Sequence, residues 1–308
     1  MPIKIVGSRG DELTPSLRTH GLANHMFMHG AEYYLSRARK LPAPRMVPDL
    51  LKLLRRPNLD SSRVARLIAS DTVLAAHVLR LCNSARFGAA TPIEDMQEAV
   101  TRVGFQEIYR MVAAASGARL LGSAHGGYGM EEGELWRHSF VAATAAQLAA
   151  RQLGEEQNLV FTAALLHDVG KTILAPALEE AGAQFGREKA APVSLLEAER
   201  KLLGVGHDET GGRLLERWSF PPNIVSAVWF HHVPKGARSE KRLASLVALG
   251  NLVACLMGYG YGHLALAMRG PPEVFGILGL APESLPGLIV ATFDQLETAD
   301  ARSELAAA

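Results

Sequence analysis

The chain has 308 residues, of which 48% are hydrophobic, and its net charge is +1, so it can bury the core of one large or two small domains. Its two cysteines, Cys82 and Cys255, lie far apart, which excludes a disulfide framework and a thiolate metal site and predicts a reducing, cytoplasmic setting. Apolar runs stay below the ~18 residues of a membrane span, and MPIKIVGSRGDE lacks the apolar stretch of a secretory signal. We therefore expect a soluble protein that does not bind a membrane.

The charge is divided unevenly along the chain. Residues 1–120 contain 17 Lys/Arg and 10 Asp/Glu, whereas residues 121–308 contain 15 and 21. A basic patch can attract nucleic acid, acidic nucleotides or an acidic partner. The basic residues between Arg37 and Arg63, however, have the spacing of solvated helix faces, so we do not expect nucleic-acid binding.

Helical periodicity and helix punctuation dominate the first part of the chain. Residues 1–23 show no clear period and are predicted to form a loose arm. Leu41-Pro42 should end the first helix, because a proline disfavours helix at the preceding residue. The predicted helices run from about Asn24 to Arg39, Pro48 to Arg55, Ser61 to Ile68, Thr72 to Cys82, Ile93 to Val103, and Gln106 to Leu121. We expect residues 24–121 to form one compact helical lobe.

A run rich in glycine, Gly122 to Gly129, follows this lobe. Gly and Ser at this density do not hold a helix, so residues 122–130 are predicted to be a mobile connection and the first site of proteolysis. These glycines do not follow a strand, and no Gly-Lys-Ser/Thr ends the run, which argues against a phosphate-binding loop.

Residues 131–295 are predicted to form a second helical domain, followed by a tail over 296–308. Ser194 and Glu197 form a capping box, in which each side chain accepts a backbone N–H of the other residue. Predicted helices run over Glu131–Gln152, Asn158–Leu174, Ser194–Leu203, Asp208–Trp218, Pro222–His232 and Lys241–Met257. The predicted fold class is therefore all-α.

Five histidines and one carboxylate of this second domain stand out together, because His138 lies on an apolar helix stripe and His167-Asp168 follows an apolar run. They are His138, His167, Asp168, His207, His231 and His232. A single such histidine is usually a hydrogen-bonded core residue, but a buried carboxylate needs a cation or dense hydrogen bonds to offset its desolvation. Imidazoles and a carboxylate from several helices suit a divalent transition metal, Fe, Mn, Ni or Zn. Water bound to such a metal can attack a phosphate ester.

The order His138, then His167-Asp168-Val169-Gly170-Lys171, then His207, then His231-His232 resembles the HD superfamily of metal-dependent phosphohydrolases. Upstream segments resemble the HDOD family, named for the HD-related output domain. They are Leu41-Pro42, Ala69 to Leu74, Leu79 to Gly88, which contains Asn83-Ser84-Ala85-Arg86-Phe87-Gly88, and Ala99 to Gly104. Together the matches cover roughly residues 25–255. This resemblance implies a bacterial signalling module, built as an N-terminal helical lobe on an HD-type helical bundle.

The resemblance also implies a division of the ligands between two metals. His138, His167, Asp168 and a carboxylate from a later helix would hold the first metal. The second would be held by Asp168, His207, His231 and His232. Asn251 stands where the final carboxylate is expected. Because an amide oxygen is neutral and a weaker ligand, we expect one metal site rather than two.

Three functions remain open. The first is a regulatory module that binds a signalling protein or a nucleotide, for which Asn83, Ser84, Arg80 and Arg86 are candidate contacts; the Asn-Ser pair could equally form a local turn. The second is a phosphodiesterase acting on nucleotides or cyclic dinucleotides, with Asp168 bridging metals and Lys171 neutralising phosphate. Lys171 could instead be an ordinary helix-end cation or ion-pair partner. The third is a di-iron oxygenase that uses the same ligands.

Overall fold

The computed structural model describes residues 30–37, 41–54, 60–84, 87, 91–183, 194–260 and 272–298. Over these residues it is helical, and its one β-type pairing is an isolated bridge between His125 and Met130. The predicted all-α fold class is confirmed. None of the helices described is long and apolar enough to cross a membrane.

The helices of the first half are α2 (Ala31–Arg37), α3 (Met46–Leu54), α4 (Ser61–Ala69), α5 (Thr72–Cys82), α6 (Met96–Val103) and α7 (Phe105–Leu121), followed by the 3-10 turn η2 (Gly126–Tyr128). The second half contains α8 (Glu134–Leu153), α9 (Gln157–Leu165), α10 (Lys171–Glu180), α11 (Leu195–Leu203), α12 (His207–Arg217), α13 (Pro222–Trp229), η3 (Pro234–Glu240), α14 (Lys241–Leu256), α15 (Val274–Leu278), η5 (Pro282–Ser284) and α16 (Leu285–Leu296).

Side-chain caps explain where several helices begin. Asp60, Asp71 and Asp95 each precede a helix in extended conformation and accept a free backbone N–H of its first turn. The Ser194–Glu197 capping box predicted from the sequence is present at the start of α11. These short-range bonds place the helix starts close to the predicted positions.

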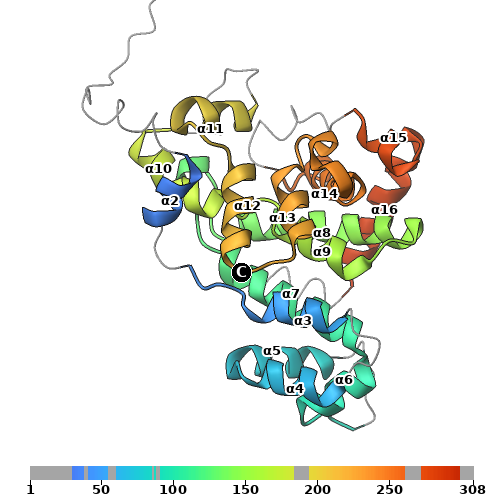
Figure 1. The fold of residues 1–308 in the computed structure, drawn as a ribbon. Coiled ribbons are helices and arrows are strands. Elements are labelled where there is room, and N and C mark those ends of the chain that lie inside the picture. Colours follow the sequence, from blue (N-terminus) through green and yellow to red (C-terminus); the bar gives the residue numbers. More distant parts are fainter. Residues whose placement is uncertain are drawn as a thin grey trace, which may run out of the picture.

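Helices α3 to α6 form a small lobe beneath the main body, as Figure 1 shows. Helix α7 connects the two parts, because it packs on α3, α5 and α6 on one side and on α8 and α9 on the other. Tyr109 of α7 is fully buried, and its hydroxyl is 2.5 Å from that of Thr162 on α9. The first helix described, α2, instead packs against α10 and α12 of the main body, where Tyr34 donates to the Leu203 carbonyl.

Helix α8 is the centre of the main body. Most of its side chains are buried, and it packs against α9, α14 and α16. Its interior face is rich in alanine, which lets neighbouring helices approach closely. The sequence did not predict α15 or α16, although α16 covers part of α8.

The prediction of one helix over residues 158–174 is wrong, because this region contains two helices. Helix α9 ends at Leu165, and a turn over 166–170 leads into α10. Pro176 lies inside α10 rather than beyond the helix end; burial of Leu174 and Leu178 outweighs the loss of one helical hydrogen bond. The turn matters because it carries His167 and Asp168.

The glycine-rich segment 122–130, predicted to be a mobile connection, packs part of its length against the main body. His125, Gly127 and Tyr128 are buried, and η2 packs on α10. A Cβ at Gly127 would lie 2.3 Å from the Ala175 carbonyl oxygen, so only glycine fits this approach. The predicted arm, the start of the first predicted helix, the end of the tail and Arg86 lie outside the described residues.

Candidate metal centre

Asp168 is the centre of the predicted constellation. Its Oδ2 lies 3.6 Å from His138 Nε2 and 3.4 Å from His167 Nε2. Its Oδ1 lies 3.2 Å from His207 Nε2 and 4.0 Å from His231 Nε2. Four helices or helix ends thus bring four imidazoles to one buried carboxylate, all five side chains being at most 2% exposed.

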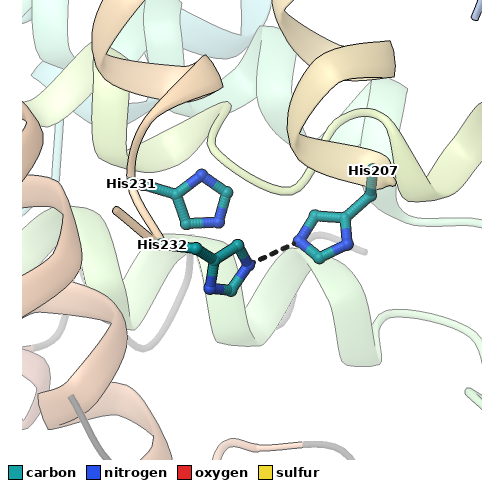
Figure 2. Close-up of side chains that lie close together, drawn as sticks. All are labelled: His207, His231 and His232. Atoms are coloured by element: carbon teal, nitrogen blue, oxygen red, sulfur yellow. Dashed lines mark hydrogen bonds between the residues drawn. The ribbon is translucent and has the colours of Figure 1, made fainter. Parts of the chain in front are cut away.

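The residues of this cluster come from two helices and from two turns. His138 lies in the second turn of α8, while His167 and Asp168 occupy the turn between α9 and α10. His207 is the first residue of α12. His231 and His232 lie in the turn after α13, and both rings point toward His207 (Figure 2). His232 Nε2 is 2.9 Å from His207 Nε2.

Backbone carbonyl groups orient three of the rings. His138, His167 and His231 each place Nδ1 within hydrogen-bond distance of a main-chain oxygen, so Nδ1 carries the proton and donates it. The acceptors are Tyr259 at 2.7 Å, Ala164 at 2.7 Å and Val228 at 2.6 Å. The Nε2 lone pairs then face Asp168, which is the arrangement that metal-ligating histidines adopt. His231 Nε2 is buried and has no hydrogen-bond partner, so it lacks the compensation that a cation would supply.

Burial and neighbouring charges keep most of the candidate ligands in the protonation state that metal binding requires. Burial raises the pKa of Asp168, but the neighbouring His167 and Lys171 outweigh it and hold that pKa well below its ordinary value. Burial lowers the pKa of His138 to about 3, and burial together with neighbouring imidazoles lowers those of His231 and His232 well below the usual value. An ionised carboxylate and neutral imidazoles are the forms that bind metals.

His207 differs from the other rings. Burial lowers its pKa, but Glu199 and a hydrogen bond to Asp168 more than offset this and raise the value to about 9. A metal ion at Nε2 of His207 would therefore displace a proton, whereas at Nε2 of His138 and His231 it would find a free lone pair.

Two groups of donors have ligand atoms within 4.8 Å of one another: His138, His167 and Asp168, and separately His207, His231 and His232. These groups follow the division that the family resemblance implies. Asn251 is buried on α14, and its Oδ1 lies 3.6 Å from the Cys255 thiol. Lys171 is buried at the start of α10, with Nζ 2.6 Å from Asp168 Oδ2, so its charge is directed at the carboxylate.

Sequence reasoning missed Glu199 and Tyr128. Glu199 is completely buried, and its carboxylate accepts hydrogen bonds from His207 and Tyr128. One signal could have revealed it, because Glu199 lies three residues after Leu196 and four before Leu203, on the buried stripe of α11. A carboxylate on such a stripe requires a partner inside the protein.

The candidate partner-binding residues of the sequence lie in the small lobe. The Asn83 amide bonds the Leu79 and Ile93 carbonyl groups and accepts the Ile93 N–H at 2.7 Å, so it joins the end of α5 to the segment before α6. Arg80 is 2.9 Å from His77, and Ser84 follows Asn83 in the turn. The Asn83 contacts are structural, which agrees with the local role considered above.

Fold and centre together define an all-helical protein with a buried His/Asp cluster. Residues 41–234 match the model of the HDOD domain, and this match covers more than half of the chain. The chain belongs to the HDOD domain family.

Solved structures share this fold. An HDOD domain protein of unknown function from Geobacter sulfurreducens has a TM-score of 0.64 and 24% identity, covering 90% of this chain and 95% of that protein. A candidate phosphohydrolase from Shewanella amazonensis SB2B has a TM-score of 0.63 and 22% identity, covering 89% and 96%. A candidate signal transduction protein from Marinobacter aquaeolei VT8 has a TM-score of 0.68 and 19% identity, covering 96% and 68%. At these identities the likeness shows the fold.

One curated relative is an uncharacterised protein from Treponema pallidum (strain Nichols), 27% identical over 215 residues. The match covers 68% of this chain but 41% of that protein, so the chain spans less than half of its relative.

Proposed function

We propose that this chain is a bacterial, cytoplasmic signalling module that holds a divalent transition metal and acts by binding a partner rather than by efficient hydrolysis. The observation that carries the proposal is the closed state of the centre. His138, His167, Asp168, His207 and His231 converge on one point and are almost completely buried, whereas His232 is partly buried. Structural metal sites are closed by protein ligands, whereas catalytic sites keep a position open to water or substrate.

Charge arrangement supports the same conclusion. Lys171, the residue expected to neutralise a substrate phosphate, is instead 2.6 Å from Asp168. Asn251 supplies no charge where the superfamily resemblance implies a carboxylate, so the first donor group would hold its metal weakly. His207, His231, His232 and Asp168 would hold the stronger metal, with Fe, Mn, Ni or Zn as its identity. A bound metal supplies Lewis acidity and lowers the pKa of coordinated water.

A surface groove offers a place for a signalling protein or nucleotide. It has a volume of about 980 Å³ and lies between the segment before α3 and helices α10 and α12. Leu41 and Pro42, which contribute to the family resemblance, line it together with Trp218. On its walls Lys52 forms an ion pair with Asp49 and Arg217 with Glu32, and Arg45 is a further basic side chain that an acidic ligand group could contact.

Metal analysis of the chain purified without added metal tests the proposal. We expect close to one transition-metal ion per chain, and loss of that ion in Asp168→Asn. Arg45→Gln, which changes the groove and leaves the ligands intact, is the matched control and should keep its metal. A wild-type chain that contains no metal and takes up none on titration would contradict the proposal.

A metal-dependent phosphohydrolase is the second candidate, and one observation favours it. The two oxygens of Asp168 face different pairs of imidazoles, as expected for a carboxylate that bridges two metals. Rapid turnover of a cyclic dinucleotide with Fe or Mn, abolished in Asp168→Ala, would establish this function instead. We expect weak or absent turnover.

A further inference from the structure

Glu199 is a fully buried carboxylate outside the predicted ligand set. It lies on α11, with Leu196 and Leu203 on the same buried stripe. Burying an ionised carboxylate is costly unless hydrogen bonds or a cation compensate it. The groups that compensate Glu199 therefore indicate its role.

Donors from two other segments surround this carboxylate. The His207 backbone N–H donates to Oε2 at 2.7 Å, and His207 Nδ1 lies 2.7 Å from Oε2 and 2.8 Å from Oε1. The Tyr128 hydroxyl donates to Oε1 at 2.8 Å. Glu199 thus binds both the ring and the backbone of one histidine at the start of α12.

This double contact determines where the other ring nitrogen points. With Nδ1–H held by Glu199, His207 Nε2 faces Asp168 Oδ1 at 3.2 Å and His232 Nε2 at 2.9 Å. The rings of His138, His167 and His231 are oriented by neutral carbonyl oxygens, whereas His207 is oriented by a carboxylate. A carboxylate partner increases the basicity of an imidazole ligand and fixes its orientation.

Tyr128 also holds this carboxylate, through Oε1. It belongs to η2, in the glycine-rich segment between α7 and α8, and it is buried. Lys171 Nζ lies 6.0 Å from the centre of its ring. The segment between α7 and α8 therefore contacts Glu199, the residue that orients His207.

We infer that Glu199 is a positioning residue of the metal centre, which orients His207 toward Asp168 and is itself held by Tyr128. This inference rests on the proposed metal-binding function. It assigns the glycine-rich segment a structural role at the centre, because Tyr128 supplies one of the three donors to the carboxylate.

The test is a double-mutant cycle on the full chain, with Mn²⁺ binding to the metal-free protein measured by calorimetry. Glu199→Gln keeps the shape but leaves one acceptor oxygen for three donors, and we expect Mn²⁺ affinity to fall by about 10- to 100-fold. Tyr128→Phe is the milder variant and should weaken binding less. Glu209→Gln, on the same helix as His207 but paired with Arg213, is the matched control and should bind as wild type.

The cycle separates positioning from general destabilisation. In a His207→Ala background, Glu199→Gln should cause no further loss of affinity, because its target is gone. Additive losses, or wild-type affinity in Glu199→Gln, would overturn the inference. If the wild-type chain takes up no Mn²⁺, the proposed function fails. In that case the melting temperatures of the same four proteins still test the inference. Non-additive shifts in melting temperature support the coupling of Glu199 to His207, and additive shifts refute it.

Discussion

Asn251 is one residue whose chemistry limits the centre. It lies one helical turn before Cys255, whose thiol approaches its amide oxygen, and the charges of Asp168 and Lys171 act on that thiol. The same end of α14 leads to Tyr259, whose carbonyl oxygen accepts from His138. This face of α14 therefore adjoins the first donor group.

We predict that Asn251→Asp increases metal content from about one toward two ions per chain, because it adds a carboxylate to His138, His167 and Asp168. Without metal the new buried charge should lower the melting temperature, and added Mn²⁺ should restore it. Metal analysis and thermal unfolding measure the two effects. Asn251→Ala, which adds no charge, is the control, and an equal gain of metal in it would contradict the prediction.

Asp71 has a separate role as a helix cap in the small lobe. Its Oδ1 accepts the Leu74 N–H at 3.0 Å, and its Oδ2 is 2.9 Å from Arg119 on α7. The Leu74 hydrogen bond and Arg119 lower its pKa below 3.8, although partial burial opposes this. A lowered pKa in the folded state stabilises the protein above the ordinary pKa, and this stabilisation is lost as pH falls through the folded value.

We expect Asp71→Ala to lower the free energy of unfolding by about 1 kcal/mol at neutral pH, the usual cost of losing an N-cap. Asp71→Asn keeps a capping oxygen and should cost less. In urea denaturation, the difference between wild type and Asp71→Asn should shrink as pH is lowered from 5 to below about 3.8. A difference that grows on acidification would contradict this assignment.

Residues that cap or terminate helices explain which elements could be predicted from the sequence. Acidic and serine caps locate the starts of α4, α5 and α11, and glycines end α8 and α11 near the predicted residues. The break between α9 and α10 was missed, because Leu166 to Gly170 contains one glycine and no proline, and His167-Asp168 was interpreted as a continuation of the apolar helix before it. That turn is stabilised by long-range packing against α12, which local sequence does not reveal.

Gly170 is the contact point between this turn and α12. A Cβ at this position would lie 2.0 Å from the His207 carbonyl oxygen and 2.7 Å from the Gly211 nitrogen, both backbone atoms. Backbone atoms cannot rotate away as a flexible side chain can. Gly170 therefore lets the element carrying Asp168 approach the element carrying His207.

We predict that Gly170→Ala destabilises the fold by about 1–3 kcal/mol and weakens metal binding, because α12 must move away from Asp168. Urea denaturation and Mn²⁺ titration measure the two effects. Gly276→Ala is the control, since Gly276 lies in α15 with nothing within 4 Å of an added Cβ. It should be neutral or stabilising by a few tenths of a kcal/mol to about 1 kcal/mol. Equal behaviour of the two variants would contradict the packing argument.

At the scale of the molecule, the sequence predicted that the site residues converge, but it did not predict the residues that orient them. His138, His167 and Asp168 were found as polar groups on apolar segments, where burial requires partners, and the family resemblance added His207 and His231. Glu199 and Tyr128 lie 71 residues apart and meet only after folding. The glycine composition of residues 122–130 predicted mobility, but the same glycines permit close packing on α10.

The last prediction concerns this segment. Because His125, Gly127 and Tyr128 are buried and Tyr128 is bonded to Glu199, limited proteolysis of the native chain should spare residues 122–129. A protease needs an extended, accessible backbone, and opening this segment would expose Tyr128 and break its bond to the buried Glu199 carboxylate. In Gly127→Val the side chain would clash with the Ala175 carbonyl oxygen, so the segment should be displaced and cleaved. Mass spectrometry of early fragments identifies the cut sites, and Gly30→Ala, where an added Cβ meets nothing within 4 Å, is the control. First cleavage of the wild-type chain within 122–129 would show that the segment opens readily, in agreement with the expectation from composition.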